Sequence, residues 1–363
     1  MITVGSVKEN SSLEKRVSIT LETAKKFKNL GFSINLEKNY ADHLGINDEE
    51  YHNNGVSKNI SKEEIFEKSN IILKVNNISL DEVNLIKNES ILIGQFDLNF
   101  NKDIISKLIK KNIKIFSLNL LPRITRAQSM DALSSQANLA GYKAVIESFS
   151  KFERAIPMMM TAAGTIPAAK VLIIGAGVAG LQAIATAKRM GAIVFATDVR
   201  ATSKQEVESL GGKFLTVEGA GNLEAEGGYA KEASEDFKKK QEVLLSETLK
   251  KIDIVICTAL IPGKKAPLII KENMIRNMKV GSLIYDLAAA QGGNAAFTEV
   301  DKVVDKSGVK IMGERNILNK LPISASNLYS KNLFNFVLNL YDKENKKINI
   351  NLEDEIIKKT LIK

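Results

Sequence analysis

The sequence predicts an α/β fold made of two Rossmann-like parallel-sheet domains that are joined by long helices. Short β-rich runs alternate with amphipathic helical runs in two separate series, which is typical of parallel sheets covered by helices. The 363 residues exceed what one ordinary core accommodates, since domains average roughly 150 residues. A glycine-rich turn at 175–180 follows directly after a β-rich run of the second series. We therefore expect two domains with a ligand-binding cleft between them.

The first series indicates an N-terminal domain over residues 1–132. Its short β-rich runs alternate with amphipathic helical runs, which predicts a parallel sheet covered by helices. The expected strands are 2–7, 32–36, 71–75, 91–95 and 113–118, and the expected helices lie near 21–30, 62–68, 80–86 and 102–111.

A long helix over about 130–154 connects this domain to the second series, which indicates a domain over residues 133–323. The glycine-rich and acidic segment 218–238 interrupts this series and is too long for an ordinary connection of a few residues, so we expect a functional loop. The expected strands are 170–174, 193–197, 213–217, 252–257, 282–286 and 310–312, with helices at 179–190 and 203–210.

The last forty residues are expected to return to the first domain. Apolar positions from Ser324 onward recur at helical spacing and predict a final helix, so that residues 324–363 complete the N-terminal domain. Residues 342–363 have the pattern of a charged tail with one more amphipathic turn.

Composition narrows the class of protein. A chain with 44% hydrophobic and 26% charged residues is typical of soluble globular proteins. The single cysteine, Cys257, excludes a disulfide framework and lies in an apolar run, where we expect a packed strand residue. The start of the chain lacks a secretory signal pattern, and the charge-free stretch 171–187 is too short to span a membrane, so we expect a cytoplasmic protein.

Neither nucleic acid nor a metal ion is expected as a partner. The net charge of +9 comes from lysine clusters that are scattered, lack interleaved aromatic residues and mostly lie beside acids on expected helices. The two histidines, His43 and His52, lie in a polar stretch without a metal-ligand spacing.

The glycine turn predicts a dinucleotide phosphate site. A Gly-x-Gly-x-x-Gly sequence is weak evidence alone, but here it follows an expected strand and opens an expected helix, which is the context that phosphate binding requires. Gly175 would allow the tight turn, Gly177 the approach of the pyrophosphate, and Gly180 close packing of helix and strand. The turn consists of Gly175, Ala176, Gly177, Val178, Ala179 and Gly180.

An acid at the end of the next strand favours NAD over NADP. Asp198 stands near the offset of ~20 residues at which a carboxylate accepts the adenosine ribose hydroxyls and repels a 2′-phosphate. Arg200 complicates this interpretation, because an arginine can bind a 2′-phosphate.

Several segments resemble the NAD(H)-binding domain I of proton-translocating nicotinamide nucleotide transhydrogenase, within the alanine dehydrogenase/transhydrogenase family. The resemblance covers nearly the whole chain and is most specific at 120–165. The chain resembles domain I in the arrangement in which this domain is a separate alpha-1 subunit. The segments are 122–136, 138–142, 157–165, 227–231, 258–263 and 292–294.

The resemblance implies a reaction and a set of site residues. Hydride would pass directly, with Si/Re specificity, between NADH on this chain and NADP+ on a partner domain, coupled to proton movement across the membrane. Arg123, fixed by Asp131, would hold the nicotinamide, while Ser134 would anchor the carboxamide and Gln128 would reach toward the second cofactor. Such a transfer needs alignment and exclusion of water rather than an acid or base. Further cofactor contacts are implied for Val199, Arg200, Gly228, Thr258, Ala259 and Leu260.

The resemblance also implies a lid and partners. The segment 218–238 would be a mobile loop that closes over NAD(H), with Tyr229 as its tyrosine. The membrane-spanning alpha-2 and beta subunits would supply the NADP(H)-binding domain and the proton channel. The chain would form a homodimer attached peripherally to the cytoplasmic face of the inner membrane. Departures from the family pattern occur at Asn77, Ala289 and Leu318, at the edges of the cofactor cleft.

Two other functions are compatible with the same fold. An alanine dehydrogenase would need cations for the substrate carboxylate, a role that Arg16 and Lys74 could play, and a histidine that the strand at 91–96 does not offer. A non-enzymatic NAD-sensing module is the third possibility, because a glycine turn determines binding but not reaction.

Overall fold

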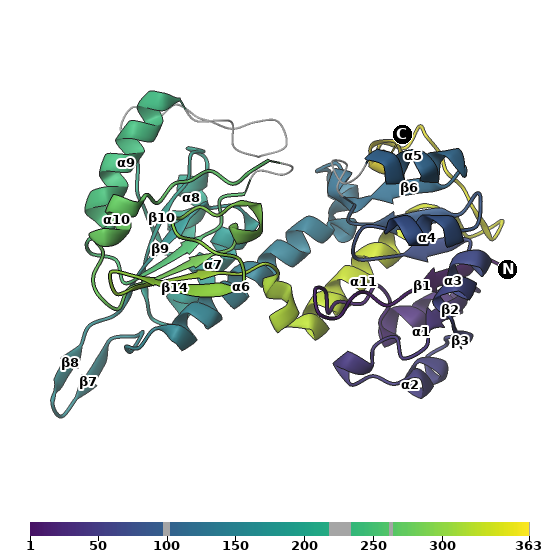
Figure 1. The fold of residues 1–363 in the computed structure, drawn as a ribbon, viewed down its shortest axis with the longest axis horizontal. Helices are drawn as coiled ribbons and strands as arrows, with labels where there is room; N and C mark the ends of the chain where they lie inside the picture. Colours follow the sequence, from purple (N-terminus) through teal and green to yellow (C-terminus); the bar gives the residue numbers. More distant parts are fainter. Residues whose placement is uncertain (97–101, 218–233, 261–263, 363) are drawn as a thin grey trace. The chain divides into compact units, whose positions relative to one another are not determined.

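The computed structural model describes residues 1–96, 102–217, 234–260 and 264–362. The chain divides into two compact units, one formed by residues 1–136 with 318–363 and the other by residues 137–317. Within these ranges each unit contains one seven-stranded sheet with helices packed on it (Figure 1). Both sheets are mostly parallel, which confirms the predicted α/β fold class.

The sheet of the first unit is parallel except at one edge. Its strand order is β18-β6-β5-β4-β1-β2-β3, and only β18 runs antiparallel to its neighbour. The order in which the chain adds strands reverses at β1, which lies between β4 and β2 and is parallel to both. The strands are β1 (Thr3–Ser6), β2 (Ser33–Glu37), β3 (Lys58–Ile60), β4 (Ile71–Leu73), β5 (Ile91–Gly94), β6 (Lys114–Ser117) and β18 (Leu361–Ile362).

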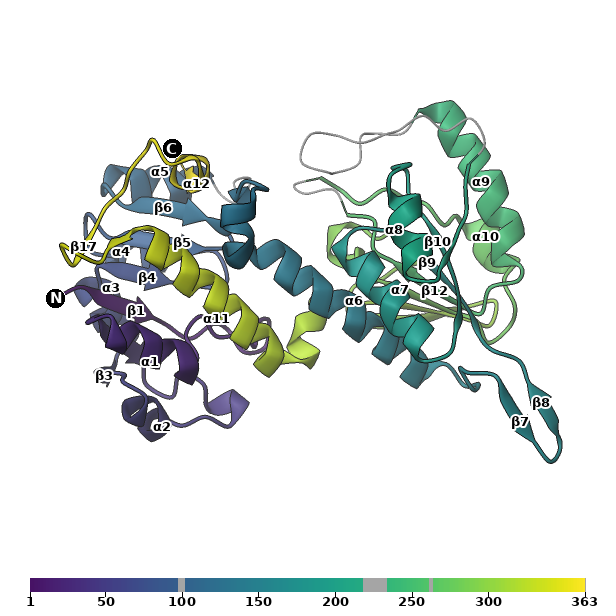
Figure 2. The ribbon, with the colours of Figure 1, turned by 180° about the vertical axis from the view of Figure 1, so that it is seen from behind.

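Alternating side chains build two apolar cores on the two faces of this sheet. Ile71 and Leu73 join the cluster that contains Phe27 of α1 (Leu21–Asn29) and Phe336 of α11 (Pro322–Asn339). Ile72, between them, joins the other cluster. The helices packed on that face are α3 (Lys62–Lys68), α4 (Leu80–Leu85) and α5 (Lys102–Lys110) (Figure 2). Helix α2 spans Asp48–Asn53.

The C-terminal segment corrects one expectation. The pattern of residues 342–363 predicts a charged tail with one more amphipathic turn. That turn is present as α12 (Glu355–Thr360), with Ile356 and Ile357 buried, but the segment is not a tail, because β18 pairs with β6. A hairpin of β16 (Tyr341–Asp342) and β17 (Lys347–Ile348) precedes them. Burial of two isoleucines against the sheet, which local polarity does not reveal, holds the segment in place.

The second unit has the strand order of a dinucleotide-binding sheet. The order β11-β10-β9-β12-β13-β15-β14 corresponds, for the six parallel strands, to the 3-2-1-4-5-6 pattern of the Rossmann fold. The antiparallel β14 is added at one edge. The strands are β9 (Lys170–Ile174), β10 (Ile193–Thr197), β11 (Lys213–Phe214), β12 (Ile254–Cys257), β13 (Leu283–Asp286), β14 (Lys302–Lys306) and β15 (Val309–Gly313).

The helices of this unit agree with the expectations except for α9 (Glu235–Leu249) and α10 (Glu272–Arg276), which the sequence did not predict. Helix α9 begins inside the segment 218–238, for which the sequence predicts a loop, and packs Leu245 and Leu249 on the sheet together with residues of α10. Cys257 is fully buried, as expected for a packed strand residue. The others are α6 (Ala132–Lys151), which begins in the first unit and ends in the second, α7 (Val178–Arg189) and α8 (Ser203–Ser209).

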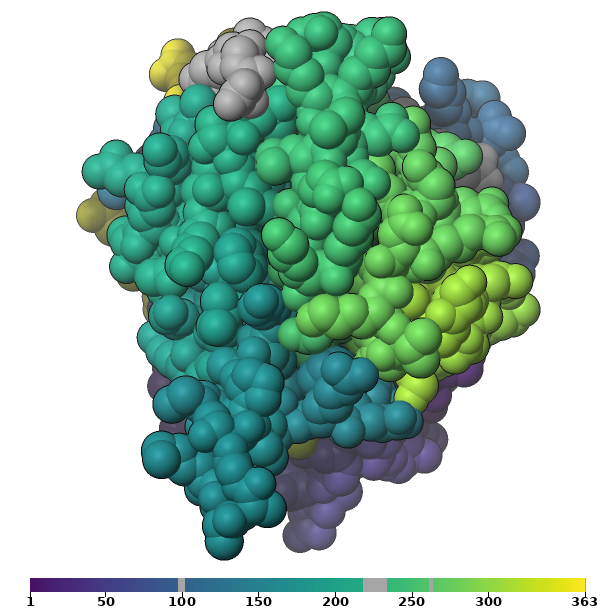
Figure 3. Space-filling view, turned by 90° about the vertical axis from the view of Figure 1, so that its left-hand side faces the viewer, coloured from purple at the N-terminus to yellow at the C-terminus, as the bar shows by residue number. Residues whose placement is uncertain are grey.

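A two-stranded hairpin projects from the second unit. It pairs β7 (Met159–Thr161) with β8 (Gly164–Ile166), and every residue of both strands is exposed. The space-filling view shows it at the lower edge of the face that it displays (Figure 3). Three consecutive methionines are exposed here, Met158 at 63%, Met159 at 44% and Met160 at 84%, and contiguous exposed apolar side chains are typical of interaction surfaces.

Candidate functional site

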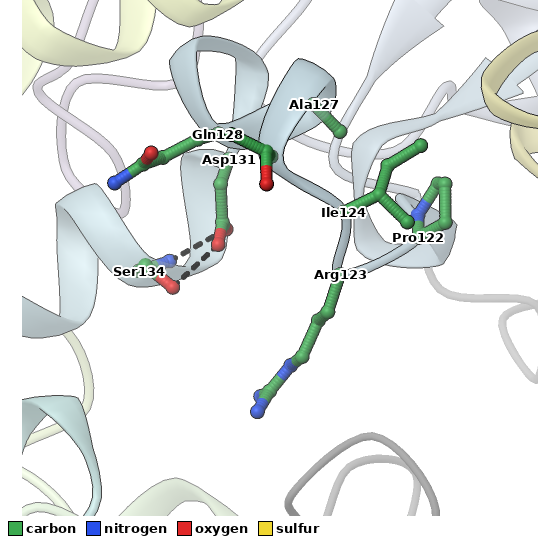
Figure 4. A pocket seen from close by; sticks show the side chains of 8 residues that line it. Pro122, Arg123, Ile124, Ala127, Gln128, Asp131 and Ser134 are labelled. Carbon is green, nitrogen blue, oxygen red and sulfur yellow. Dashed lines mark hydrogen bonds between the residues drawn. The ribbon is translucent and has the colours of Figure 1, made fainter.

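A pocket in the first unit gathers the four residues expected around the nicotinamide. It has a volume of about 270 Å³ and lies at the 3-10 helix η3 (Thr125–Met130) and the first turn of α6. Gln128 and Arg123 are exposed, whereas Asp131 and Ser134 are half-buried (Figure 4). The lining residues are Pro122, Arg123, Ile124, Thr125, Ala127, Gln128, Asp131 and Ser134.

Asp131 caps α6 in this pocket. Its Oδ1 accepts a 2.9 Å hydrogen bond from the Ser134 amide and its Oδ2 a 2.5 Å bond from the Ser134 hydroxyl. Aspartate is favoured at this position because its carboxylate satisfies amides that the first helical turn leaves without an intrahelical partner. The resemblance implies that Asp131 fixes Arg123, but the Arg123 side chain extends away from it in Figure 4.

Residues that sequence reasoning missed hold η3 in place. The Ser129 carbonyl accepts hydrogen bonds from the side-chain amides of Asn332 and Asn335 on α11. Arg126 forms a two-pronged ion pair with Asp354, the residue that caps α12. The Arg126 guanidinium lowers the pKa of Asp354 from its ordinary 3.8 to about 2. The sequence carries no signal for these contacts, because 203 residues separate Ser129 from Asn332 and 228 separate Arg126 from Asp354.

In the second unit the glycine turn has the geometry that a phosphate site needs. Gly175 has φ +91°, a conformation that favours glycine, and a Cβ on Gly180 would lie 1.8 Å from the Gly175 carbonyl oxygen. A Cβ on Gly177 would meet nothing within 4 Å. Protein atoms therefore crowd the positions of a side chain at Gly175 and Gly180, whereas the space beside Gly177, at the N-terminus of α7, is free of them.

Asp198 and Arg200 meet beside this turn. The Asp198 carboxylate accepts a 2.6 Å hydrogen bond from the Ala176 amide and 2.9 Å bonds from the Arg200 amide, Nε and a terminal nitrogen. From the sequence, Asp198 favours NAD and Arg200 would suit the 2′-phosphate of NADP, whereas the structure pairs the two side chains with each other. Val199 lies between them, half-buried.

A buried carboxylate at the end of β13, that of Asp286, organises the segment that follows this strand. Asp286 accepts hydrogen bonds from the amides of Ala288, Asn294 and Ala295 and from the Thr298 hydroxyl. Asn294 in turn bonds to both backbone groups of Ala259. This network, which sequence reasoning missed, holds the segment that contains the expected contact residues.

Of these contact residues, Thr258 is tied directly to the glycine turn. Its hydroxyl donates a 2.8 Å bond to the Gly175 carbonyl. Ala259 is half-buried and Leu260 exposed, so the segment reaches the surface there. Gly228 and Tyr229, with the rest of 218–233, lie outside the described residues.

Two kinds of feature are absent from the described ranges. No helix there combines the length and the apolar character that crossing a bilayer takes. No three histidine, cysteine or acidic side chains within those ranges lie together as metal ligands would.

These features define a two-unit α/β protein of the Rossmann type. The chain belongs to the alanine dehydrogenase/PNT family: the model of the family's N-terminal domain matches residues 5–140 and that of its C-terminal domain residues 144–363. The resemblance noted in the sequence is thereby confirmed.

Relatives place it near the transhydrogenase branch. The chain is 46% identical over 362 residues to the first part of NAD(P) transhydrogenase subunit alpha of Rhodospirillum rubrum, covering 98% of this chain and 94% of that one. The crystal structure of transhydrogenase from Sinorhizobium meliloti matches with a TM-score of 0.87 at 42% identity, over 99% and 97% of the two chains. An L-alanine dehydrogenase matches with 0.80 at 20% identity, over 99% and 94%, which shows the fold alone.

Proposed function

We propose that this chain is the NAD(H)-binding subunit of a proton-translocating transhydrogenase. The observation that carries the proposal is the turn 175–180 of the second unit, open only at Gly177 and bonded through Ala176 to Asp198. Chain-wide similarity to the first part of a transhydrogenase subunit alpha supports it. In this proposal hydride passes directly between NADH on this chain and NADP+ on a partner domain, with Si/Re specificity.

The residues of the turn fit a dinucleotide. The first amides of α7 have no intrahelical partner and lie at the positive end of the helix dipole, so they would bind the pyrophosphate where Gly177 leaves space. Asp198 would accept the ribose hydroxyls. Thr258, Ala259 and Leu260 would border the cofactor. The Thr258 hydroxyl is bonded to the Gly175 carbonyl and the Ala259 amide to Asn294, which keeps this segment beside the turn.

The pocket at η3 would hold the nicotinamide end. When bound, the cofactor supplies the hydride, so the chain's task is to align the ring and exclude water. Ser134, held by Asp131, would anchor the carboxamide, and the exposed Arg123 and Gln128 would meet the ring and the second cofactor. Gly228 and Tyr229 would belong to the loop that closes over the cofactor.

The reaction also defines the partners. Membrane-spanning alpha-2 and beta subunits would supply the NADP(H) site and the proton path, and this chain would attach to them at the cytoplasmic face of the inner membrane. A homodimer would bury the exposed methionines at the β7–β8 hairpin. The name of the Rhodospirillum rubrum relative, which is one part of an alpha subunit, supports an assembly of several chains.

The buried cations of the first unit argue against the alanine dehydrogenase alternative. Arg16 forms a bidentate pair with Glu14, and Lys74 lies 3.5 Å from both Glu9 and Glu82. An oxo acid would have to displace these carboxylates. Both histidines bond to backbone carbonyls, His43 to that of Lys15 and His52 to that of Val56.

Reconstitution tests the proposal. The purified chain is mixed with an NADP(H)-binding transhydrogenase domain, and NADH-dependent reduction of an NADP analogue is followed. We expect turnover that falls at least tenfold in Gln128→Ala and Asp131→Asn, while Gln205→Ala on the exposed side of α8 keeps it. NADH formation from alanine and NAD+ by the chain alone, without transhydrogenation in the mixture, would overturn the proposal.

A further inference from the structure

The Asp198 carboxylate has no hydrogen-bonding capacity left for a ribose. An ionised carboxylate offers about four lone-pair positions, two on each oxygen. Oδ1 accepts from the amide and Nε of Arg200, and Oδ2 accepts from the Ala176 amide and a terminal nitrogen of Arg200. A ribose diol therefore cannot reach Asp198 in its preferred geometry unless one of these donors leaves.

The guanidinium is the donor that can move. The Ala176 amide belongs to the turn, whose neighbour Gly175 donates from its amide to the Thr197 carbonyl at 2.9 Å. The Arg200 amide is part of the backbone two residues from Asp198. The Arg200 side chain, by contrast, changes position by rotating single bonds, and 15% of it already contacts solvent, against 6% of the Asp198 side chain.

We infer that Arg200 is a displaceable occupant of the ribose site, and that binding of the adenosine half exchanges its guanidinium for the ribose diol on Asp198. The inference rests on the proposed function, since it assumes that NAD(H) binds at this turn. Arg200 would then influence affinity and selectivity by competing with the ribose for Asp198, rather than by a simple contact with the cofactor.

The exchange has a consequence for the choice between NAD and NADP. While paired, Arg200 neutralises the charge by which Asp198 would repel a 2′-phosphate. Once displaced, its guanidinium remains close to the ribose and is a preferred partner for phosphate. Arg200 thus opposes the binding of a plain ribose and favours that of a 2′-phosphorylated one.

Calorimetric titration of Arg200→Gln tests this with two ligands, ADP-ribose and its 2′-phosphorylated form. We expect ADP-ribose to bind about tenfold more tightly than to the unaltered chain, because two charge-assisted hydrogen bonds no longer have to be broken. The 2′-phosphorylated form should bind more weakly. Opposite changes for two ligands of one site cannot arise from partial unfolding, which weakens both.

Two further variants complete the test. Arg189→Gln removes the same charge at the far end of α7, about 18 Å along the helix, and should leave both affinities unchanged. Arg200→Lys keeps the charge without the two-pronged geometry and should fall between the unaltered chain and Arg200→Gln.

The outcomes separate this inference from the proposed function. If the unaltered chain binds ADP-ribose and Arg200→Gln binds both ligands with unchanged affinity or weakens both, the exchange is wrong while the NAD(H) site stands. If the unaltered chain binds neither NADH nor ADP-ribose, the proposed function fails, and the exchange fails with it.

Discussion

Gly141 of α6 lies against Ala179 of α7 so closely that a Cβ on Gly141 would be 2.0 Å from the Ala179 carbonyl oxygen. The neighbouring atom is backbone, within the helix that follows the glycine turn, so it cannot rotate away. Helix α6 and the candidate phosphate site are therefore in direct contact within the second unit, and the spacing between them depends on the missing side chain.

Gly141→Ala should push α6 away from the start of α7. We expect a loss of about 1–3 kcal/mol in the free energy of unfolding, as overpacking of a tight contact gives, together with weaker NADH binding. Denaturant unfolding and NADH fluorescence titration measure the two effects. An unchanged unfolding midpoint would show that the helix yields without cost.

Gly177→Ala should have the opposite signature. Its Cβ would meet no protein atom within 4 Å, and its φ of −74° suits alanine, so the free energy of unfolding should change by less than about 0.5 kcal/mol. NADH affinity should fall at least tenfold, about 1.4 kcal/mol, because the methyl group occupies the approach of the pyrophosphate. Tight NADH binding by this variant would contradict the assigned phosphate position.

Asp286→Asn should loosen the segment 288–298, which follows β13. The new amide group would face donors that a carboxylate oxygen now satisfies, at a cost of about 1–3 kcal/mol in stability. Faster hydrogen exchange at the amides of Asn294 and Ala295 would report the loss directly. Asp305→Asn, on exposed β14, serves as the matched control and should leave both quantities unchanged.

The Arg126–Asp354 ion pair should make stability depend on pH at the acidic end. Because the folded pKa of Asp354, about 2, lies below its ordinary 3.8, the pair stabilises the fold above pH 3.8 and loses this contribution as the pH falls toward 2. Arg126 is 54% exposed, so solvent screening limits the effect to about 1 kcal/mol.

Arg126→Gln should therefore be less stable than the unaltered chain near pH 5 and equally stable near pH 2. Urea unfolding at a series of pH values measures the difference. A gap that persists at pH 2 would assign the loss to packing of the side chain rather than to the ion pair.

Replacing the exposed methionines at the β7–β8 hairpin should break the proposed homodimer. We expect Met158→Glu with Met160→Glu to convert a dimer into a monomer in light scattering, because charges would replace buried apolar contacts. Met190→Glu, a half-exposed methionine outside the hairpin, should leave the dimer intact. A monomeric unaltered chain would refute the proposed dimer.

Much of the fold was predictable because its signals are local. Strands β9 and β10 each contain four consecutive apolar residues, and helix α7 begins within one residue of its expected start. Helix α9 was missed because only Phe237, Leu245 and Leu249 are buried along fifteen residues, which is too sparse a stripe to give helical periodicity. The placement of β18 depends on β6, some 245 residues earlier, which no local pattern records.

By itself, the sequence determined that a glycine turn follows a buried strand and that an acid ends the next one, since backbone freedom and burial are properties of short segments. Only the tertiary structure decided which partners are chosen by groups far apart in the sequence: Asp354 for the Arg126 guanidinium, and Asn332 for the Ser129 carbonyl. The physical reason is that a carboxylate or a guanidinium pairs with whichever complementary group the fold brings within about 3 Å, and sequence distance does not measure that separation.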